Sequence, residues 1–398
     1  SVCTGNIRLN AKRNAMRLEN CYKTSDFRQL AKRRLPSPIF HYIDGGSDDE
    51  VTMGRNTAAF DAVDLVPNVL AGVESVDLTT NVLGKQLRMP LFMSPTAMQR
   101  LFHHDGELAL AEAAAKLGTM FGVSTIGTRS IEELGEYSDA PKLFQIYVHN
   151  DPGLTDDLIE RCKAARFDAL ALTVDTIVAG NRERDFATGM TTPPKLTIRS
   201  MLSFLAHPDW LSNYLFRPKF DLPNISKYID VGSKVQSSVM DYIDQQLKRS
   251  ISWDDAARMI EAWGGPFAIK GVMSVGDARR AVDIGASAIM VSNHGGRQLD
   301  GSRAPFDQLP AIVDAVGGDI EIIVDGGVRR GSHVLKALAM GATACSGGRL
   351  YLYALAAAGA AGVERAMTLL RNEIERDMLL MGCRRIADLK RSMVAARP

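Results

Sequence analysis

Eight short apolar runs recur along the chain, and this repeat limits the fold more than any other feature of the sequence. Helical patterns such as GELALAEAAAKLG and GSHVLKALAMG lie between the runs and end in glycine, which commonly stops a helix. Such alternation is typical of βα units around a parallel sheet, and eight units predict a closed (β/α)8 TIM barrel of the α/β class. The runs are 89–95, 122–126, 142–148, 169–175, 267–272, 288–295, 321–327 and 342–348.

Length and composition narrow the class of protein. One α/β barrel with insertions can account for all 398 residues. Hydrophobic residues make up 46% of the chain, charged residues 23%, and the net charge is +1, as is typical of a globular protein. This balance predicts no nucleic-acid partner, because such proteins carry a basic patch or stripe.

The cysteines predict neither a disulfide framework nor a zinc site, since they are scattered and none belongs to a CxxC pair. No other pattern in the sequence leads us to expect a metal site. Free cysteines fit a reducing cytoplasm best. They are Cys3, Cys21, Cys162, Cys345 and Cys383.

We expect one domain with an insertion. Residues 1–24 are predicted to be an N-terminal extension, without the continuous apolar stretch of a signal peptide or a membrane-spanning helix. Residues 25–398 are predicted to form the barrel domain, beginning with N-terminal helices. About 90 residues separate the fourth run from the fifth, which is far more than a βα loop and its helix need. A long insertion after strand 4, at about 186–250, is therefore predicted.

Within this insertion, residues 199–220 combine apolar and aromatic side chains with Arg199, Arg217 and Lys219. A basic amphipathic stretch of this kind can dock on a membrane surface or on a partner subunit. It can equally be a lid packed on its own barrel. Both alternatives stay open, and the first predicts a cytoplasmic protein on the cytoplasmic face of the inner membrane. The apolar residues are Met201, Leu202, Phe204, Leu205, Trp210, Leu211, Tyr214, Leu215 and Phe216.

Polar residues follow the strands at the end where such barrels build their active sites. His294 and Arg297 follow the sixth run, separated by two glycines. A histidine can take a proton at neutral pH, and an arginine can hold a carboxylate by two parallel hydrogen bonds. Alone, His294 would more often be a hydrogen-bonded histidine at a strand end, but the pair favours a site for a hydroxy acid.

The fourth run ends at Asp175, and Arg182 follows in the next loop. Alone, Asp175 would more often cap a helix. A base histidine, however, needs an acidic partner, and a second cation would help to bind a carboxylate.

Three further motifs predict a phosphorylated ligand. Lys270 lies inside an apolar strand, where a lysine is rare unless it meets an anion or a polar cofactor. DGGVRRG (325–331) and GGR (347–349) place glycines and arginines at the ends of strands seven and eight, where these barrels bind phosphate.

Several motifs in the same order resemble the FMN-dependent L-2-hydroxy-acid oxidase and dehydrogenase family. They are PTAMQ (95–99), QIY (145–147), TVDT (173–176), SNHGGRQLD (292–300) and DGGVRRG, and the likeness extends from about Ser25 to about Leu389. The resemblance implies FMN as cofactor, oxidation of a 2-hydroxy acid to the 2-oxo acid, and electron transfer to a quinone, a cytochrome or O2. It also implies a homotetramer.

The resemblance assigns roles residue by residue. It makes His294 the base with Asp175 as its partner, and Arg182 and Arg297 the clamp for the substrate carboxylate. Tyr42 and Tyr147 would line the substrate site, together with Ala97, Ile126 and Ala179. The implied FMN contacts are Pro95, Thr96, Ala97, Ser124, Gln145, Thr173, Lys270, Ser292, Asp325, Gly326, Gly327, Arg329, Gly348 and Arg349.

The same resemblance implies how large the substrate pocket is. Glycolate oxidases carry a large aromatic residue at the position of Ile126 and a leucine at that of Ala179, so a substrate larger than glycolate is expected. The chain departs from the family at Ile177, where proline is usual, and in the ATACSGGR of its eighth strand. Neither departure removes a catalytic group.

Two other functions would share part of this motif set. A phosphate-binding barrel isomerase or an FMN-using nucleotide dehydrogenase would share the glycine-rich corner but should lack the set His294, Arg297 and Arg182. A flavin-binding barrel kept for assembly or regulation would show a broken catalytic set, whereas this chain has a complete one.

Overall fold

The computed structural model describes residues 17–190, 196–218, 220–228 and 246–397. Most of the predicted extension, residues 1–16, lies outside the described residues, as do residues 191–195, Lys219 and residues 229–245 of the predicted insertion.

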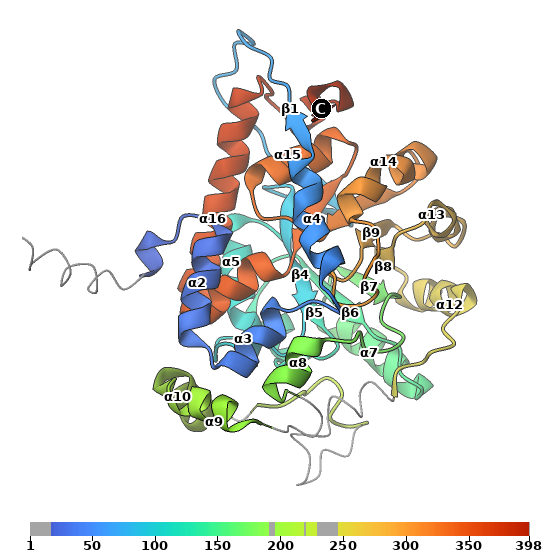
Figure 1. Cartoon of the computed structure of the whole chain (residues 1–398). Coiled ribbons are helices and arrows are strands. Elements are labelled where there is room, and N and C mark those ends of the chain that lie inside the picture. Colours follow the sequence, from blue (N-terminus) through green and yellow to red (C-terminus); the bar gives the residue numbers. More distant parts are fainter. Residues whose placement is uncertain (1–16, 191–195, 219, 229–245, 398) are drawn as a thin grey trace, which may run out of the picture.

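Eight parallel strands close into a barrel, which confirms the predicted fold (Figure 1). Hydrogen bonding runs around the barrel in the order β10, β11, β4, β5, β6, β7, β8 and β9. Each strand coincides with one of the predicted runs. They are β4 (Leu91–Thr96), β5 (Phe121–Ser124), β6 (Lys142–Ile146), β7 (Ala169–Thr173), β8 (Phe267–Val272), β9 (Ala288–Ser292), β10 (Glu321–Asp325) and β11 (Ala344–Gly347).

Helices surround the strands and bury the larger apolar core between the two layers. Serine or aspartate caps begin several of them, and glycines in the left-handed conformation end α5 and α12, as predicted. The ring consists of α5 (Glu107–Leu117), α6 (Ile131–Tyr137), α7 (Pro152–Ala164), α12 (Trp253–Trp263), α13 (Val275–Asp283), α14 (Pro305–Val316), α15 (Gly331–Ala339) and α16 (Arg349–Leu380).

The barrel interior holds a separate apolar cluster, which includes Phe92, Leu143 and Ile323. A small antiparallel pair, β2 (Thr80–Val82) and β3 (Lys85–Leu87), contributes Val82, Leu83 and Leu87 to the same cluster. The side chains of the barrel therefore fill it at the end opposite the strand termini that carry the polar motifs.

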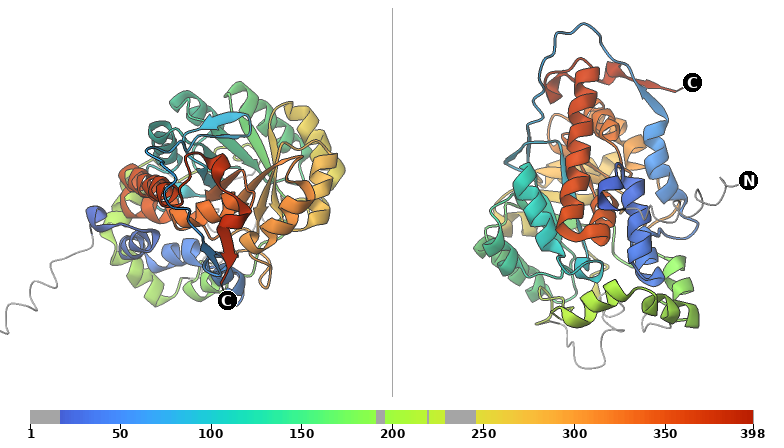
Figure 2. Two further views of the ribbon diagram at one scale, coloured as in Figure 1. Left: turned by 90° about the horizontal axis from the view of Figure 1, so that it is seen from above. Right: turned by 90° about the vertical axis from the view of Figure 1, so that its left-hand side faces the viewer.

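Three N-terminal helices pack on the barrel, namely α2 (Thr24–Arg34), α3 (Ser37–Asp44) and α4 (Val51–Asp61). The first of these lies along α16 (Figures 1 and 2). Beyond α4, β1 (Val63–Leu65) pairs with β12 (Val394–Ala396). Short 3-10 turns at Leu18–Asn20, Gln99–Leu101, Ile386–Asp388 and Arg391–Met393 complete the described elements.

Asp44, the last residue of α3, fixes that helix over the mouth of the barrel. Its buried carboxylate accepts hydrogen bonds from Arg28 of α2 (2.8 Å), from Arg184 (2.9 Å) and from Tyr353 of α16 (2.8 Å). Burial favours the neutral acid, but hydrogen bonds and charge from Arg28 and its neighbours prevail and lower the pKa of Asp44. Tyr42, two residues earlier, is thereby held at the site.

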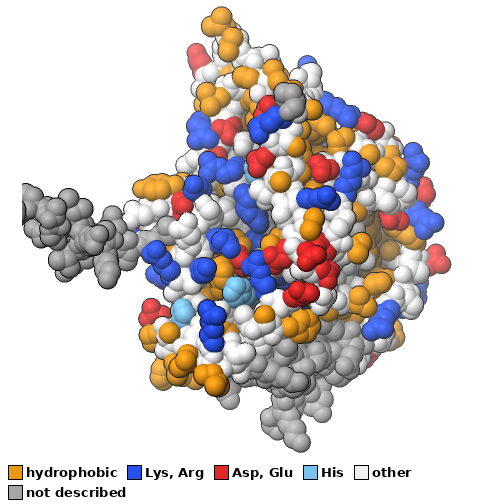
Figure 3. Space-filling model, viewed as in Figure 1, with side chains coloured by type: hydrophobic (Ala, Val, Ile, Leu, Met, Phe, Trp, Pro, Cys, Tyr) orange, Lys and Arg blue, Asp and Glu red, His pale blue; other side chains and the backbone are white. Residues whose placement is uncertain are grey.

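The insertion forms α8 (Glu183–Thr188), α9 (Ile198–Leu205) and α10 (Pro208–Phe216). One face of the α9–α10 pair packs on the protein: Trp210 is buried and donates from Nε1 to the carbonyl of Leu101 (2.8 Å). The other face is open, and its apolar side chains gather at the lower left of Figure 3. The open residues are Ile198, Met201, Leu202, Leu205, Leu215 and Phe216.

The packed face agrees with the lid interpretation of residues 199–220, and the docking interpretation stays a prediction. Among the described residues, each helix is too short or too polar to cross a membrane.

Candidate active site

A pocket opens at the C-terminal ends of the barrel strands and is covered by α3 and the loop after β7. Most residues predicted from the sequence line it. They are Tyr42, Pro95, Thr96, Ala97, Ile126, Tyr147, Ala179, Arg182, Lys270, His294, Arg297, Asp325, Gly326, Gly327, Arg329, Gly348 and Arg349.

The remaining predicted residues support this lining at the strand ends. Asp175 contacts His294, and Ser292 contacts Lys270. Ser124 donates to the side-chain oxygen of Gln145 (2.9 Å), and Thr173 ends β7.

The backbone conformation of residues 294–296 explains why two glycines follow the histidine. His294, Gly295 and Gly296 all have positive φ, at 58°, 67° and 74°, and glycine adopts this left-handed region without the steric cost that other residues pay. A Cβ on Gly296 would lie 2.5 Å from the backbone nitrogen of Met53, so the second glycine also admits α4. The turn brings both His294 and Arg297 to the pocket.

His294 is paired with a carboxylate. Its Nδ1 lies 3.0 Å from Oδ1 of Asp175, and its Nε2 lies 3.5 Å from the hydroxyl of Tyr147. Burial would raise the pKa of Asp175, but the attraction of His294 and Lys270 outweighs burial and lowers that pKa. An ionised Asp175 favours the tautomer with hydrogen on Nδ1, which leaves the lone pair of Nε2 facing the pocket.

The loop that carries Asp175 is fastened by Gln298, which the sequence analysis did not single out. Its Nε2 donates to the carbonyls of Asp175 (3.0 Å) and Val178 (2.9 Å), and its Oε1 accepts from the nitrogen of Gly180 (3.1 Å). Thr176, also missed, donates to Asp175 Oδ1 (3.2 Å) and lines the pocket. Both residues lie within motifs already quoted, SNHGGRQLD and TVDT, so membership of those motifs was the available signal.

Two guanidinium groups make the pocket electropositive. They lie 5.6 Å (Arg182) and 5.2 Å (Arg297) from the ring centre of Tyr42. Arg297 donates to the carbonyls of Tyr42 (2.7 Å) and Gly45 (3.0 Å), while Arg182 pairs with Asp185 (2.9 Å). Burial, followed by repulsion from Arg182, lowers the pKa of Arg297 to about 10. A bound anion would relieve this repulsion.

Tyr147 can donate a hydrogen bond in this setting. Burial raises its pKa to about 12, so the phenol stays protonated at neutral pH. Phe102 stacks on Tyr42, with ring centres 6.2 Å apart, and Leu247 reaches the pocket from the end of the insertion. No sequence pattern indicated Leu247, because only the fold brings it there.

The pocket floor fits the expected FMN. Lys270 lies 3.1 Å from Asp325 in a buried ion pair, and this pairing overcomes burial and raises the pKa of the lysine. Among the described residues, the buried Nε2 of Gln145 and Oγ1 of Thr173 have no hydrogen-bond partner. Unpaired buried polar atoms at strand ends are costly, and a polar ring edge would satisfy them.

Some residues of the glycine-rich corner (325–331 and 347–349) hold other parts of the protein in place. A Cβ on Gly327 would lie 1.9 Å from the carbonyl oxygen of Asn56, so this glycine is needed for the approach of α4. The guanidinium of Arg349 donates to the carbonyls of Ile43, Gly45 and Gly295, although the residue also lines the pocket. Gly348 is the N-cap of α16, whose first turn faces the pocket.

Comparison with known proteins gives consistent results. A family model described as FMN-dependent dehydrogenase matches residues 31–396. An L-lactate oxidase from Nostoc sp. is 40% identical over 93% of this chain and 96% of its own length. An L-lactate dehydrogenase from Vibrio cholerae is 40% identical over 94% of this chain and 99% of its own.

Solved structures agree with these sequence relatives. The crystal structure of a monotopic membrane protein, (S)-mandelate dehydrogenase, superposes with a TM-score of 0.89 at 33% identity. It covers 95% of this chain and 100% of that one. A soluble mutant of the membrane-associated (S)-mandelate dehydrogenase from Pseudomonas putida superposes with a TM-score of 0.81 at 32% identity.

The contacts of Gln298 yield a prediction. Gln298→Met keeps the length of the side chain but removes three hydrogen bonds from the loop that carries Asp175. Since a misplacement of about 1 Å can cost about 100-fold in rate, we expect steady-state kcat/KM to fall about 10- to 100-fold. The control is Gln308→Met, which removes a surface hydrogen bond with Arg303. Equal kinetics of the two variants would contradict the role given to Gln298.

Proposed function

This chain belongs to the FMN-dependent dehydrogenase family, and from that premise we propose how its residues carry out FMN-dependent oxidation of an L-2-hydroxy acid to the 2-oxo acid. The observation that carries the proposal is the pair His294 and Asp175, with Nδ1 and Oδ1 3.0 Å apart, beside two arginines in one pocket.

We assign the substrate carboxylate to Arg297 and Arg182. These two charges repel each other in the pocket, and a carboxylate between them offsets that repulsion. The ring of Tyr42 faces both guanidinium groups. Tyr147 keeps its hydroxyl proton and would donate a hydrogen bond to the bound substrate.

His294 then takes a proton from the bound hydroxy acid at Nε2. Asp175 stabilises the resulting imidazolium through its bond to Nδ1. Bound FMN supplies the two-electron acceptor of the reaction. Lys270, Asp325 and the partnerless polar atoms of Gln145 and Thr173 would hold its ring, and the Gly326–Arg329 and Gly348–Arg349 corner would hold its phosphate.

The first test is direct. Purified holoenzyme mixed anaerobically with L-lactate or L-mandelate should lose its yellow colour as the flavin is reduced. In His294→Gln the reduction rate should fall by about 100- to 10,000-fold, the usual contribution of a general base. FMN content should be unchanged, because Lys270 and Asp325 are untouched. Near-normal reduction by this variant would overturn the assignment of His294.

Substrate size is the second proposal. Ile126 and Ala179 line the pocket, and their small side chains leave space at its wall. Phe102 and Leu247 also line the pocket. Filling the space with substrate gains about 0.8 kcal/mol for each buried methylene. We therefore assign the enzyme to L-lactate or to a longer or aryl 2-hydroxy acid such as L-mandelate, rather than to glycolate.

Ala179→Leu tests this assignment. The ratio of kcat/KM for L-mandelate to that for glycolate should fall at least about tenfold, since one lost contact of this size is worth about 1–3 kcal/mol. Val178→Leu is the matched control, because Val178 lies in the same loop but not in the pocket lining. If glycolate is the best substrate of the unaltered enzyme, the size proposal is wrong.

The third proposal concerns where the protein is located in the cell and which molecule accepts its electrons. The open face of α9 and α10 presents apolar side chains with Arg199 and Arg217 nearby, a combination that binds the interface of anionic membranes. We propose a cytoplasmic homotetramer attached peripherally to the inner membrane. This location favours a membrane quinone or a cytochrome over O2 as electron acceptor.

Sedimentation with anionic phospholipid vesicles tests the attachment. The enzyme should pellet with the vesicles, and the double variant Leu205→Glu, Phe216→Glu should remain largely in the supernatant, because it places two charges on the open face. Leu70→Glu is the control, since Leu70 is exposed in the loop after β1. Equal pelleting of the double variant and the unaltered enzyme would leave α9 and α10 as a lid only.

A further inference from the structure

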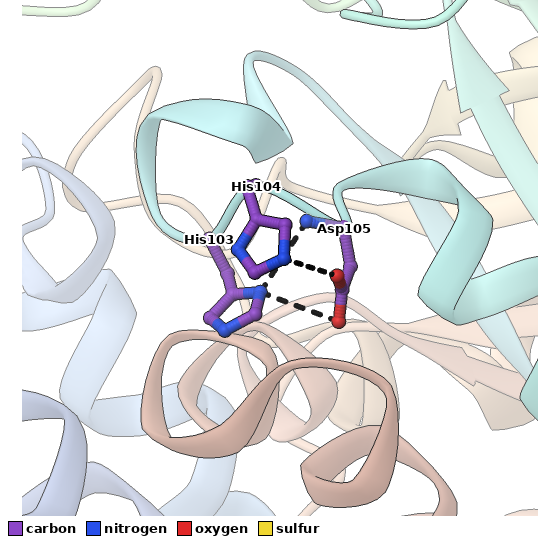
Figure 4. A group of neighbouring side chains, drawn as sticks. All are labelled: His103, His104 and Asp105. Atoms are coloured by element: carbon purple, nitrogen blue, oxygen red, sulfur yellow. Dashed lines mark hydrogen bonds and ion pairs between the residues drawn. The ribbon is translucent and has the colours of Figure 1, made fainter. Parts of the chain in front are cut away.

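His103, His104 and Asp105 form a compact group on the loop between β4 and α5 (Figure 4). In the part of the chain that the structure describes, the atoms with which these three side chains could bind a metal ion all lie within 4.8 Å of one another. Nδ1 of His103 lies 3.3 Å from Oδ2 of Asp105, and Nε2 of His104 lies 3.1 Å from Oδ1. The two imidazole rings stack, with centres 4.4 Å apart.

The two nitrogen–oxygen distances, each to a different oxygen of Asp105, are close to the separation between two ligands of one metal ion. Nitrogen and oxygen ligands at about 2.0–2.2 Å from a tetrahedral zinc ion lie about 3.3 Å from each other. Two nitrogens and one carboxylate oxygen suit Zn²⁺ and similar transition metals, whereas Mg²⁺ and Ca²⁺ prefer oxygen ligands alone. The three side chains are 17–29% exposed, so solvent can supply the fourth ligand.

The surroundings hold the group in this arrangement. Asp105 Oδ2 accepts from the backbone nitrogen of Ala360 (2.9 Å), just beyond the kink of α16 at Ala358 and Gly359. A Cβ on Gly359 would lie 2.3 Å from that oxygen and 2.4 Å from His103, so the glycine lets α16 close one side of the group.

Histidine binds metals through a neutral ring nitrogen. The cysteine pattern predicted no zinc site, but this group contains no cysteine and its spacing in sequence matches no common zinc motif.

We propose that His103, His104 and Asp105 bind one divalent transition-metal ion of the Zn²⁺ type, with solvent completing the coordination. The bound ion would fix the conformation of the β4–α5 loop, which the hydrogen bond between Asp105 and Ala360 joins to α16. The same loop carries Phe102 in the substrate pocket and Leu101, which bonds to Trp210. The site lies outside the pocket lining and takes no part in the proton transfer assigned to His294.

Calorimetric titration of Zn²⁺ into the metal-free, untagged holoenzyme tests the proposal. We expect one ion per chain, no corresponding binding of Mg²⁺, and an X-ray absorption spectrum with two imidazole ligands. His104→Gln should weaken binding at least about tenfold, since even outer partners of a metal site contribute that much. Zn²⁺ should also raise the Tm of the unaltered enzyme more than that of the variant, because ligand binding stabilises the folded state.

His207→Gln is the matched control, because His207 lies on the same side of the protein but outside the group. It should bind Zn²⁺ as the unaltered enzyme does. FMN content and Tm without metal report whether each variant folds, and His103→Gln replaces His104→Gln if the latter does not. The proposal is wrong if Zn²⁺ shows no saturable binding up to about 1 mM. It is also wrong if a folded His104→Gln or His103→Gln variant binds Zn²⁺ as tightly as the unaltered enzyme. In either case Asp105 would serve only to cap the second half of α16.

Discussion

One carboxylate joins five strands at the catalytic end of the barrel. Asp325 ends β10, and its Oδ1 accepts hydrogen bonds from Ser94 of β4 and Ser346 of β11. Its Oδ2 accepts from Ser292 of β9 (2.8 Å) and pairs with Lys270 of β8 (3.1 Å). Such a buried charge is tolerated only when its partners satisfy it fully. The network therefore sets the relative height of the strands from which the site residues extend.

The network also reaches His294. The hydroxyl of Ser292 that donates to Asp325 accepts from the backbone nitrogen of His294 (3.1 Å). Lys270 is held between this network and Asp175, whose pKa its charge helps to lower. Lys270, Asp325 and the backbone of His294 thus share hydrogen bonds with Ser292.

The barrel and most of the pocket lining were predictable because both follow from local signals. Apolar runs and glycine stops define the βα units, and the residues just beyond each strand must meet at one end. What the sequence could not reveal depends on contacts between distant segments. Gln298 acts on the loop after β7, Leu247 reaches the pocket from the insertion, and Gly327 serves the approach of α4. The two-faced nature of α9 and α10 likewise appears only when Trp210 meets Leu101.

The backbone of His294 has a further consequence. A side chain at φ 58° costs about 1 kcal/mol or more relative to glycine, and the same turn brings the imidazole to the pocket. A glycine there would relieve this strain but remove the imidazole. Stability and the function proposed for His294 therefore make opposite demands on this position.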